Sequence, residues 1–313
     1  MMMLFPLIPG RAQEKVQELS IPMEDGTHWW MCITNHGQMM PIAEGYQADI
    51  YAESYGNQVQ PLLLSDQGDF IWSEEAFAVS CSEGVLRVDS HGAGLVHDKG
   101  GTTLREAYLE AGRRFFPPSG KLPDMMLVTA PQYNTWIELM YDQNQKDILT
   151  YARSVVDNGF PPGVLMIDDN WQEDYGNWKF HPTRFPDPHA MMDSLHGMGF
   201  KVMLWVCPFV SPDSYIFRDL QDKGYLMRRN ASSAAILGWW NGYSGLLDLS
   251  HPGAKKWFTD ELAHLVETYG VDGFKFDAGD AKYYKGLVSH KDISANEHCR
   301  LYGELGLDFP LNE

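Results

Sequence analysis

The sequence is poor in the features that mark metal, redox and membrane proteins. Its four cysteines, Cys32, Cys81, Cys207 and Cys299, lie far apart, with no CxxC pair and no neighbouring pair of histidines. This spacing argues against zinc and dithiol sites and predicts free, buried thiols. No apolar run approaches the roughly 18 residues that a membrane span needs.

A targeting segment and an excess of positive charge are lacking too. The start, MMMLFPLIPG, is apolar but has neither a positive n-region nor a small-residue cleavage site. We therefore expect a soluble, cytoplasmic chain without a membrane partner. There are 24 Lys and Arg against 42 Asp and Glu, a formal net charge of −18. Because this charge repels phosphate, nucleic acid is not an expected partner.

Apolar and aromatic residues, by contrast, are abundant. Hydrophobic residues make up 44% of the chain and aromatic residues 13%, with ten Trp and fifteen Tyr. This composition excludes a disordered chain, and 313 residues can bury a large core in two domains. Aromatic faces occur in sugar sites and in cores alike, so their number alone does not distinguish the two.

The first region, residues 1 to about 100, has the pattern of β-strands and turns. Short aromatic or β-branched runs are interrupted by Gly, Asn and Asp. Such runs occupy residues 28–37, 47–57, 61–75 and 77–94. Many short strands with turn residues between them predict a β-sandwich.

A helix is expected next, in residues 101–124. Thr103 and Glu106 form a capping box at its start, and Pro117 and Pro118 end it. We place the domain boundary within this segment and assign residues 1–110 to the sandwich. Residues 111–313 then form the second domain.

After residue 125 apolar strands alternate with amphipathic helices. Strands are expected within residues 125–139, 163–171, 201–210 and 271–280. Helices are expected within residues 143–160, 189–200 and 250–270, the last with Ser250 as N-cap and Pro252 in its first turn. This alternation implies a parallel sheet that is covered on both faces.

A doubly wound sheet and a (β/α)8 TIM barrel both fit that alternation. No GxGxxG follows the first strand, which weakens a dinucleotide-binding interpretation. Polar and aromatic residues gather where the strands end, at Trp136, Asp168, Asp169, Trp171 and Asp277. A TIM barrel builds its active site at that edge, so the barrel is favoured.

The acids at these strand ends need an explanation. Asp277 ends the apolar run in VDGFKFDAGD, where a carboxylate is expected only if it is paired, coordinated or reactive. It could be the nucleophile of a retaining glycosidase, or it could cap the loop or pair with Lys275. Asp168 could bind two sugar hydroxyls, and Asp169 could be a salt-bridge partner. A carboxylate cluster that binds Mg²⁺ is a third alternative.

Four blocks of sequence resemble one known family in order and approximate spacing. They are RFFPPSGKLPDMMLVTAPQYNTW, PPGVLMIDDNW, GWWNGYSGLLDLSHPGAKKWF and DGFKFDAGD. With the sandwich-like first region, they make the chain similar to glycoside hydrolase family 31, the retaining α-glycosidases. The resemblance implies a β-sandwich followed by a TIM barrel.

The resemblance also implies roles for individual residues. Asp277 matches the catalytic nucleophile, and Asp168 matches the acid that binds sugar hydroxyls. Trp136 and Trp240 match aromatic walls of the sugar subsite, and Asp248, Ser250 and Pro252 match a structural helix start. The implied substrate-binding set is Trp136, Asp168, Asp169, Trp240 and Lys275. The double displacement needs no metal and no organic cofactor.

Lys275 is the residue that indicates which sugar the site binds. It replaces the Trp of the glucosidase form, and the resulting motif is most similar to the branch that contains the myogenesis-regulating glycosidase, which resembles an α-galactosidase. The implied substrate is therefore a terminal α-galactoside, within an oligosaccharide or another glycoside. An α-glucosidase is the next alternative in the family, and a sulfoquinovosidase is more distant.

The sequence departs from the family in one respect. The family's acid/base is an Asp on a later strand, and nothing after Asp277 matches its motif, although Asp280, Asp308 and Glu313 are available carboxylates. Four expected strands give about the first half of a barrel, so we interpret the chain as a piece that lacks the acid/base and has little activity alone. Its exposed strand edges should aggregate or recruit a second half. A homo-oligomer is a further possible partner.

Two other classes remain open. One is a carbohydrate-binding protein that kept the pocket and lost turnover. The other is a metal-dependent barrel hydrolase that uses Asp168, Asp169 and Asp277.

Overall fold

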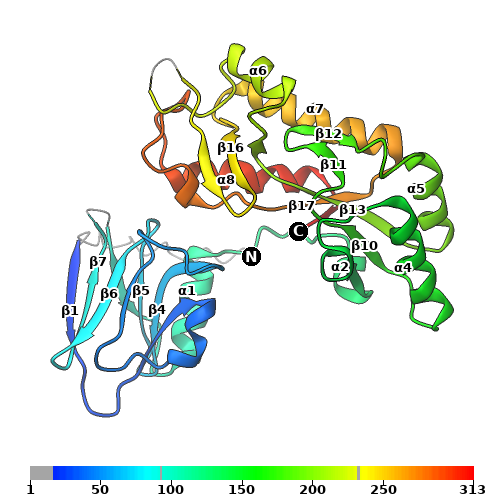
Figure 1. Cartoon of the computed structure of the whole chain (residues 1–313). Coiled ribbons are helices and arrows are strands. Elements are labelled where there is room, and N and C mark those ends of the chain that lie inside the picture. Colours follow the sequence, from blue (N-terminus) through cyan, green and yellow to red (C-terminus); the bar gives the residue numbers. More distant parts are fainter. Residues whose placement is uncertain (1–16, 92–93, 231–232) are drawn as a thin grey trace, which may run out of the picture. The chain divides into compact units, whose positions relative to one another are not determined.

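The computed structural model describes residues 17–91, 94–230 and 233–313, so the apolar start lies outside the described residues. The chain divides into two compact units, Met1–Gly120 and Lys121–Glu313 (Figure 1). Within the described ranges, no helix combines the length and the apolar character that crossing a membrane requires.

The first unit contains two antiparallel sheets of four strands each, in the orders β1-β7-β6-β3 and β2-β4-β5-β8. The first sheet consists of β1 (Glu18–Pro22), β3 (Gln47–Asp49), β6 (Ala78–Ser82) and β7 (Val85–Asp89). The second consists of β2 (Trp29–Ile33), β4 (Val59–Ser65), β5 (Asp69–Trp72) and β8 (Val96–Lys99). A short 3-10 helix, η1 (Thr34–Met39), follows β2.

Both sheets contribute to one core. Alternate residues are buried along β2 and β6, as expected for strands with one face toward a core. Met31 and Ile71 of the second sheet share a cluster with Val79 and Val88 of the first. The two sheets therefore form two layers around a common apolar interior.

Helix α1 (Leu104–Phe115) covers the other face of the second sheet. Ala107 and Ala111 pack with Leu62 and Leu64, which alternate with the core residue Leu63. The second sheet is thus buried on both faces, which explains the unbroken apolar run in β4. Because α1 packs on this sheet, the units separate after Gly120, and the expected division at residue 110 falls inside the helix.

The cap of α1 is as the sequence predicted. The Thr103 hydroxyl accepts a hydrogen bond from the Glu106 amide, and the Glu106 carboxylate accepts one from the Thr102 amide at 2.7 Å. The first bond satisfies an amide that the first turn of a helix leaves without a partner, and the second ties the residue before the N-cap to the same turn. The helix ends at Phe115, just before the two prolines.

The second unit is built on a parallel sheet in the order β18-β17-β13-β10-β9. Its strands are β9 (Gln132–Asn134), β10 (Val164–Ile167), β13 (Lys201–Val206), β17 (Gly273–Phe276) and β18 (Leu311–Asn312). Its helices are α2 (Met126–Thr129), α3 (Trp136–Leu139), α4 (Gln145–Asp157), α5 (Pro188–Gly197), α6 (Tyr215–Asp222), α7 (Pro252–Tyr269) and α8 (Ala295–Gly303). Shorter elements are β11 (Gln172–Asp174), β12 (Asn177–Phe180), β14 (Phe209–Val210), β15 (Leu237–Trp239), β16 (Gly242–Leu246), η2 (Ala281–Tyr283) and η3 (Glu304–Asp308).

The two faces of this sheet have different neighbours. Leu204 and Phe274 pack in the large core with residues of α4, α5 and α7 (Figure 1). On the other face, Met166 and Met203 form a small cluster against α2. Burial on both faces explains why the strands are apolar throughout.

Three expectations for this unit are wrong in detail. Residues 125–139 form α2, β9 and α3 rather than one long strand. A fifth strand, β18, was missed because two residues show no periodicity. The N-cap of α7 is His251, whose Nδ1 accepts from the Gly253 amide at 3.0 Å, and not Ser250.

Ser250 is instead tied to a buried carboxylate. Its amide lies 3.1 Å from Asp248 Oδ1, and its hydroxyl donates to the same oxygen. Asp248 Oδ2 accepts from the His290 amide, and Ser250 Oγ accepts from the Lys291 amide at 3.0 Å. The pair thus joins the start of α7 to a loop about forty residues further along the chain. These contacts support a structural role for Asp248 and Ser250.

Candidate active site

The register of three strands places the polar residues in one row at the carboxyl edge of the sheet. Ile167 pairs with Leu204, and Trp205 pairs with Lys275, so Asp168, Trp205 and Lys275 lie side by side. Since side chains alternate along a strand, Lys275 lies on the face opposite to Phe274. Phe274 belongs to the helix-covered core, and Lys275 faces the polar site.

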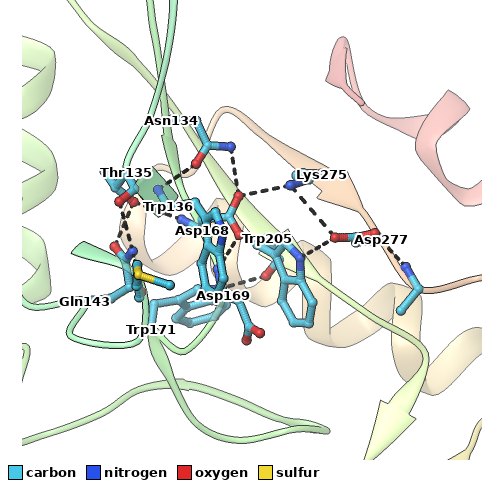
Figure 2. Close-up of polar contacts among 12 residues, drawn as sticks. Asn134, Thr135, Trp136, Gln143, Asp168, Asp169, Trp171, Trp205, Lys275 and Asp277 are labelled. Atoms are coloured by element: carbon cyan, nitrogen blue, oxygen red, sulfur yellow. Dashed lines mark hydrogen bonds and ion pairs between the residues drawn. The ribbon is translucent and has the colours of Figure 1, made fainter. Parts of the chain in front are cut away.

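The Lys275 ammonium group lies between two carboxylates (Figure 2). Nζ is 3.0 Å from Asp168 Oδ2 and 3.8 Å from Asp277 Oδ2. Burial lowers the pKa of Lys275, but Asp168, with smaller contributions from Asp277 and Glu313, outweighs burial and the net direction is upward. Lys275 therefore remains a cation and supplies positive charge beside Asp277.

Asp277 follows β17 and is fixed through both carboxylate oxygens. The Trp205 indole donates to Oδ2 at 2.8 Å, and the Ala278 amide donates to Oδ1 at 2.9 Å. The Asp277 side chain is 36% exposed, whereas that of Asp168 is 5% exposed. Asp277 is thus the more exposed carboxylate of this row.

Asp168 is held from the neighbouring strand. Its Oδ2 accepts a hydrogen bond from Asn134 Nδ2 at 2.8 Å, beside the bond from Lys275. Asn134 Oδ1 also accepts from the Trp136 amide at 2.8 Å, at the start of α3 (Figure 2). Asn134 therefore links the position of Trp136 to that of Asp168.

Asp169 belongs to a different set of contacts. Tyr175 donates to Asp169 Oδ1 at 3.1 Å, and Asn241 Nδ2 donates to Oδ2. Burial raises the pKa of Asp169 to about 6, although these hydrogen bonds lower it. The salt-bridge alternative for Asp169 is not supported, because these partners are a hydroxyl group and an amide; its substrate-binding role stays a prediction.

The tryptophans fall into two groups. Trp171 is fully buried and donates to the Trp205 carbonyl at 2.8 Å, so it is a core residue despite following a strand. Trp136 is half-buried, and Trp240 is 53% exposed beside Trp239, with the ring centroids 5.2 Å apart. Trp136 and Trp240 remain the predicted sugar platforms.

No metal cluster is formed by the part of the chain that the structure describes, where no three His, Cys, Asp or Glu residues are placed to hold an ion. The four cysteines are free. In the row of acids, the Lys275 ammonium group occupies the position between Asp168 and Asp277 that a bridging cation would take.

Sequence reasoning missed several residues of the site. Asn134 and Trp205 bind the two carboxylates, and Tyr175 and Asn241 bind Asp169. Asn134 could have been found as the polar residue at the end of the first strand. Trp205 lies within an apolar strand and gives no local signal.

Comparison with known proteins identifies the family. Residues 127–303 match the model of the glycosyl hydrolases family 31 TIM-barrel domain. The chain belongs to glycoside hydrolase family 31. It is 33% identical over 172 residues to the myogenesis-regulating glycosidase of Mus musculus, covering 55% of this chain and 24% of that protein. It is 29% identical over 171 residues to α-xylosidase XylQ of Lactiplantibacillus pentosus, covering 51% and 22%.

Solved structures of family 31 share the fold. A Flavobacterium johnsoniae dextranase complexed with glucose matches with a TM-score of 0.73 at 16% identity, over 92% of this chain and 37% of that one. A sulfoquinovosidase from E. rectale, in complex with an aza-sugar inhibitor, matches with a TM-score of 0.66 at 15% identity, over 92% and 48%. The family 31 chain described here spans about a quarter of the length of the two curated relatives.

Proposed function

We propose that this chain belongs to a retaining α-glycosidase in which Asp277 is the nucleophile. The observation that supports this role is the setting of its carboxylate. It is reachable at the end of β17, oriented by the Trp205 indole and the Ala278 amide, and has Lys275 Nζ 3.8 Å away. These donors suit a carboxylate that must be negatively charged when it attacks.

The reaction is a double displacement. An Asp277 oxygen bonds to the anomeric carbon while the bond to the leaving oxygen breaks, and that oxygen takes a proton from an acid. The product is a β-linked glycosyl ester of Asp277. The same acid, now a base, removes a proton from water, which attacks the anomeric carbon and releases Asp277 with the α-configuration retained.

The remaining site residues have supporting roles in this proposal. Asp168 accepts hydrogen bonds from sugar hydroxyls, and Trp136 and Trp240 provide aromatic walls. Following the family resemblance, we assign the acid/base to a strand later in the barrel than β17. The parallel sheet is then one part of a TIM barrel, with the first unit as the β-sandwich that precedes it.

For the sugar, we propose a terminal α-galactoside, because Lys275 replaces the Trp of the glucosidase form of the motif. An α-xyloside is the second candidate, since a relative of 29% identity is named an α-xylosidase. α-Glucosides and sulfoquinovosides follow. A cytoplasmic location and a homo-oligomer remain predictions.

The test is covalent labelling of the 313-residue chain. 5-Fluoro-α-galactosyl fluoride and its glucosyl and xylosyl counterparts have a leaving group that needs little protonation, so labelling does not depend on the acid. Intact-mass and peptide mass spectrometry would locate the adduct. We expect a galactosyl adduct on the peptide that contains Asp277.

Two variants make this test specific. Asp277→Asn should lower the labelling rate by more than about a thousandfold, because the amide is a poor nucleophile. Asp308→Asn changes an exposed carboxylate and should label like the parent chain. Labelling that survives Asp277→Asn would refute the nucleophile assignment. Saturable sugar binding without any adduct would favour the carbohydrate-binding alternative, and labelling lost to a chelator would favour the metal-dependent one.

A further inference from the structure

The carboxylate of Asp169 is buried and bound by several donors of the protein itself. It is 3% exposed, and Tyr175 Oη lies 3.1 Å from Oδ1 and 3.2 Å from Oδ2. Oδ2 also accepts from Asn241 Nδ2, and the Asn170 amide adds a further hydrogen bond. Three donors from the protein therefore hold this buried carboxylate in place.

These donors come from separate segments of the second unit. Tyr175 lies in the turn between β11 and β12, and Asn241 lies at the tip of the β15–β16 hairpin. The hairpin tip also bears Trp240, one of the two predicted sugar platforms. Its neighbour Trp239 is held between Phe209 and Tyr175, with ring centroids 4.3 and 4.9 Å away.

The hydrogen bonds continue from the hairpin to the second platform. Tyr141 donates to Asn241 Oδ1 at 2.6 Å. The Tyr141 ring packs edge-on against Trp136, with centroids 5.0 Å apart at 88°. The Tyr141 carbonyl in turn accepts from Asn170 Nδ2 at 2.7 Å. Asp169, Asn241 and Tyr141 therefore connect the loops that bear Trp240 and Trp136.

We propose that Asp169 is a positioning residue that acts through Asn241 and Tyr141 to hold the Trp136 loop and the Trp240 hairpin in one fixed arrangement. Asp168 and Asp277 then contact the sugar, while Asp169 sets the aromatic walls beside it. This inference rests on the proposed function for the identity of the walls. The connection between the two loops is a separate claim, because it can be measured without any sugar.

The first experiment is hydrogen exchange of the 313-residue chain, followed in residues 136–142 and 237–246. Tyr141→Phe removes the hydroxyl group and keeps the ring, and Asn241→Ala removes the amide. We expect each variant to speed exchange in both segments by about fivefold, the value of one net hydrogen bond. Tyr243→Phe makes the same chemical change at a position of the hairpin that is 73% exposed. It should leave the exchange rates of both segments unchanged.

The second experiment measures the concentration dependence of labelling by 5-fluoro-α-galactosyl fluoride. Tyr141→Phe and Asn241→Ala should each raise the half-saturating concentration about fivefold and leave the limiting rate within about twofold, because the nucleophile is untouched. In the double variant, the half-saturating concentration should be no higher than in the single variant with the larger effect. Both changes break the same connection, so their effects should not add.

The outcomes separate the two claims. Faster exchange confined to the mutated segment, or additive effects in the double variant, would overturn the positioning role. A fall in limiting rate with unchanged half-saturation would overturn it as well. If the parent chain is not labelled by any donor but exchange changes in both segments, the connection holds and the proposed glycosidase function fails.

Discussion

Lys275 determines the charge balance at the end of the sheet. Its ammonium group lies 3.0 Å from Asp168, whose side chain is 5% exposed. Lys275→Met keeps most of the stem and leaves Asp168 without its cation. We expect the free energy of unfolding to fall by about 2 kcal/mol, because a buried carboxylate then lacks its positively charged partner. Urea denaturation at neutral pH measures this change.

Lys256→Met is a matched control. Lys256 pairs with Asp260 at 2.7 Å, but the two side chains are 74% and 61% exposed. Its removal should cost less than about 0.5 kcal/mol. If the two variants lose equal stability, the Lys275 pair does not behave as a buried one.

Asp169 gives the site a pH dependence. Burial raises the pKa of Asp169 to about 6 from its ordinary value of 3.8, so the folded chain holds this proton more tightly than the unfolded chain. Stability from this group is then greatest below about pH 4 and decreases as pH rises to about 6, by about 3 kcal/mol in total. The groups that face Asp169 and modulate this effect are Tyr175, Asn241, the Asn170 amide, Asp168, Tyr141 and Cys207.

Asp169→Asn isolates that contribution, because the amide does not titrate. The stability of the parent chain relative to this variant should decline between pH 4 and pH 7, while other titrating groups cancel in the difference. Urea midpoints at several pH values measure it. A difference that stays constant, or one that grows with pH, would mean that Asp169 does not have a raised pKa.

At the scale of elements, α8 holds the loop that follows β17. The Tyr302 hydroxyl lies 3.1 Å from the Val206 carbonyl oxygen and 3.0 Å from that of Asp277, so it joins the ends of β13 and β17. A Cβ at Gly279 would lie 2.2 Å from the Tyr302 ring. The loop after the nucleophile therefore needs a glycine for this close approach.

Gly279→Ala should lower the unfolding free energy by about 1–3 kcal/mol, because the ring or the loop must move. It should also slow labelling of Asp277, because the Asp277 carbonyl oxygen accepts a hydrogen bond from the same Tyr302 side chain. Gly303→Ala is the control, because a Cβ there meets nothing within 4 Å and the residue is at the end of α8. Unchanged stability and labelling in Gly279→Ala would contradict the steric role.

At the scale of the molecule, each unit has its own core. Phe77 belongs to the core of the first unit and Phe274 to that of the second, and both are fully buried. We expect two calorimetric transitions. Phe77→Ala should destabilise the first unit by about 3–5 kcal/mol and move one transition, and Phe274→Ala should move the other. A single transition shifted by both variants would show that the units unfold together.

Local pattern was enough for much of this molecule. Alternation of strands and helices predicted the parallel sheet, and the Thr103–Glu106 pair predicted the start of α1. Both depend on neighbours in sequence, within one turn or one strand. The short elements failed, as β18 and the helices α2 and α3 show, because a few residues have no measurable period.

The site, too, has residues that the sequence predicted and contacts that it could not predict. Motif and position at a strand end pointed to Asp168, Asp277 and Lys275. The sequence could not show that Trp205 donates to Asp277 or that Tyr141 reaches Asn241, since these partners are 72 and 100 residues apart. Such contacts depend on strand register and loop packing, which no local pattern encodes.

The sequence by itself therefore determined the family, the parallel sheet and the residues at its carboxyl edge, because these follow from periodicity and from motifs within short segments. Only the tertiary structure decided which partners each of those residues has. It paired Asp168 with Lys275 beside Asp277 and enclosed Asp169 among Tyr175 and Asn241. The physical reason is that adjacent acids at the end of a strand point in different directions, so their partners come from different parts of the chain.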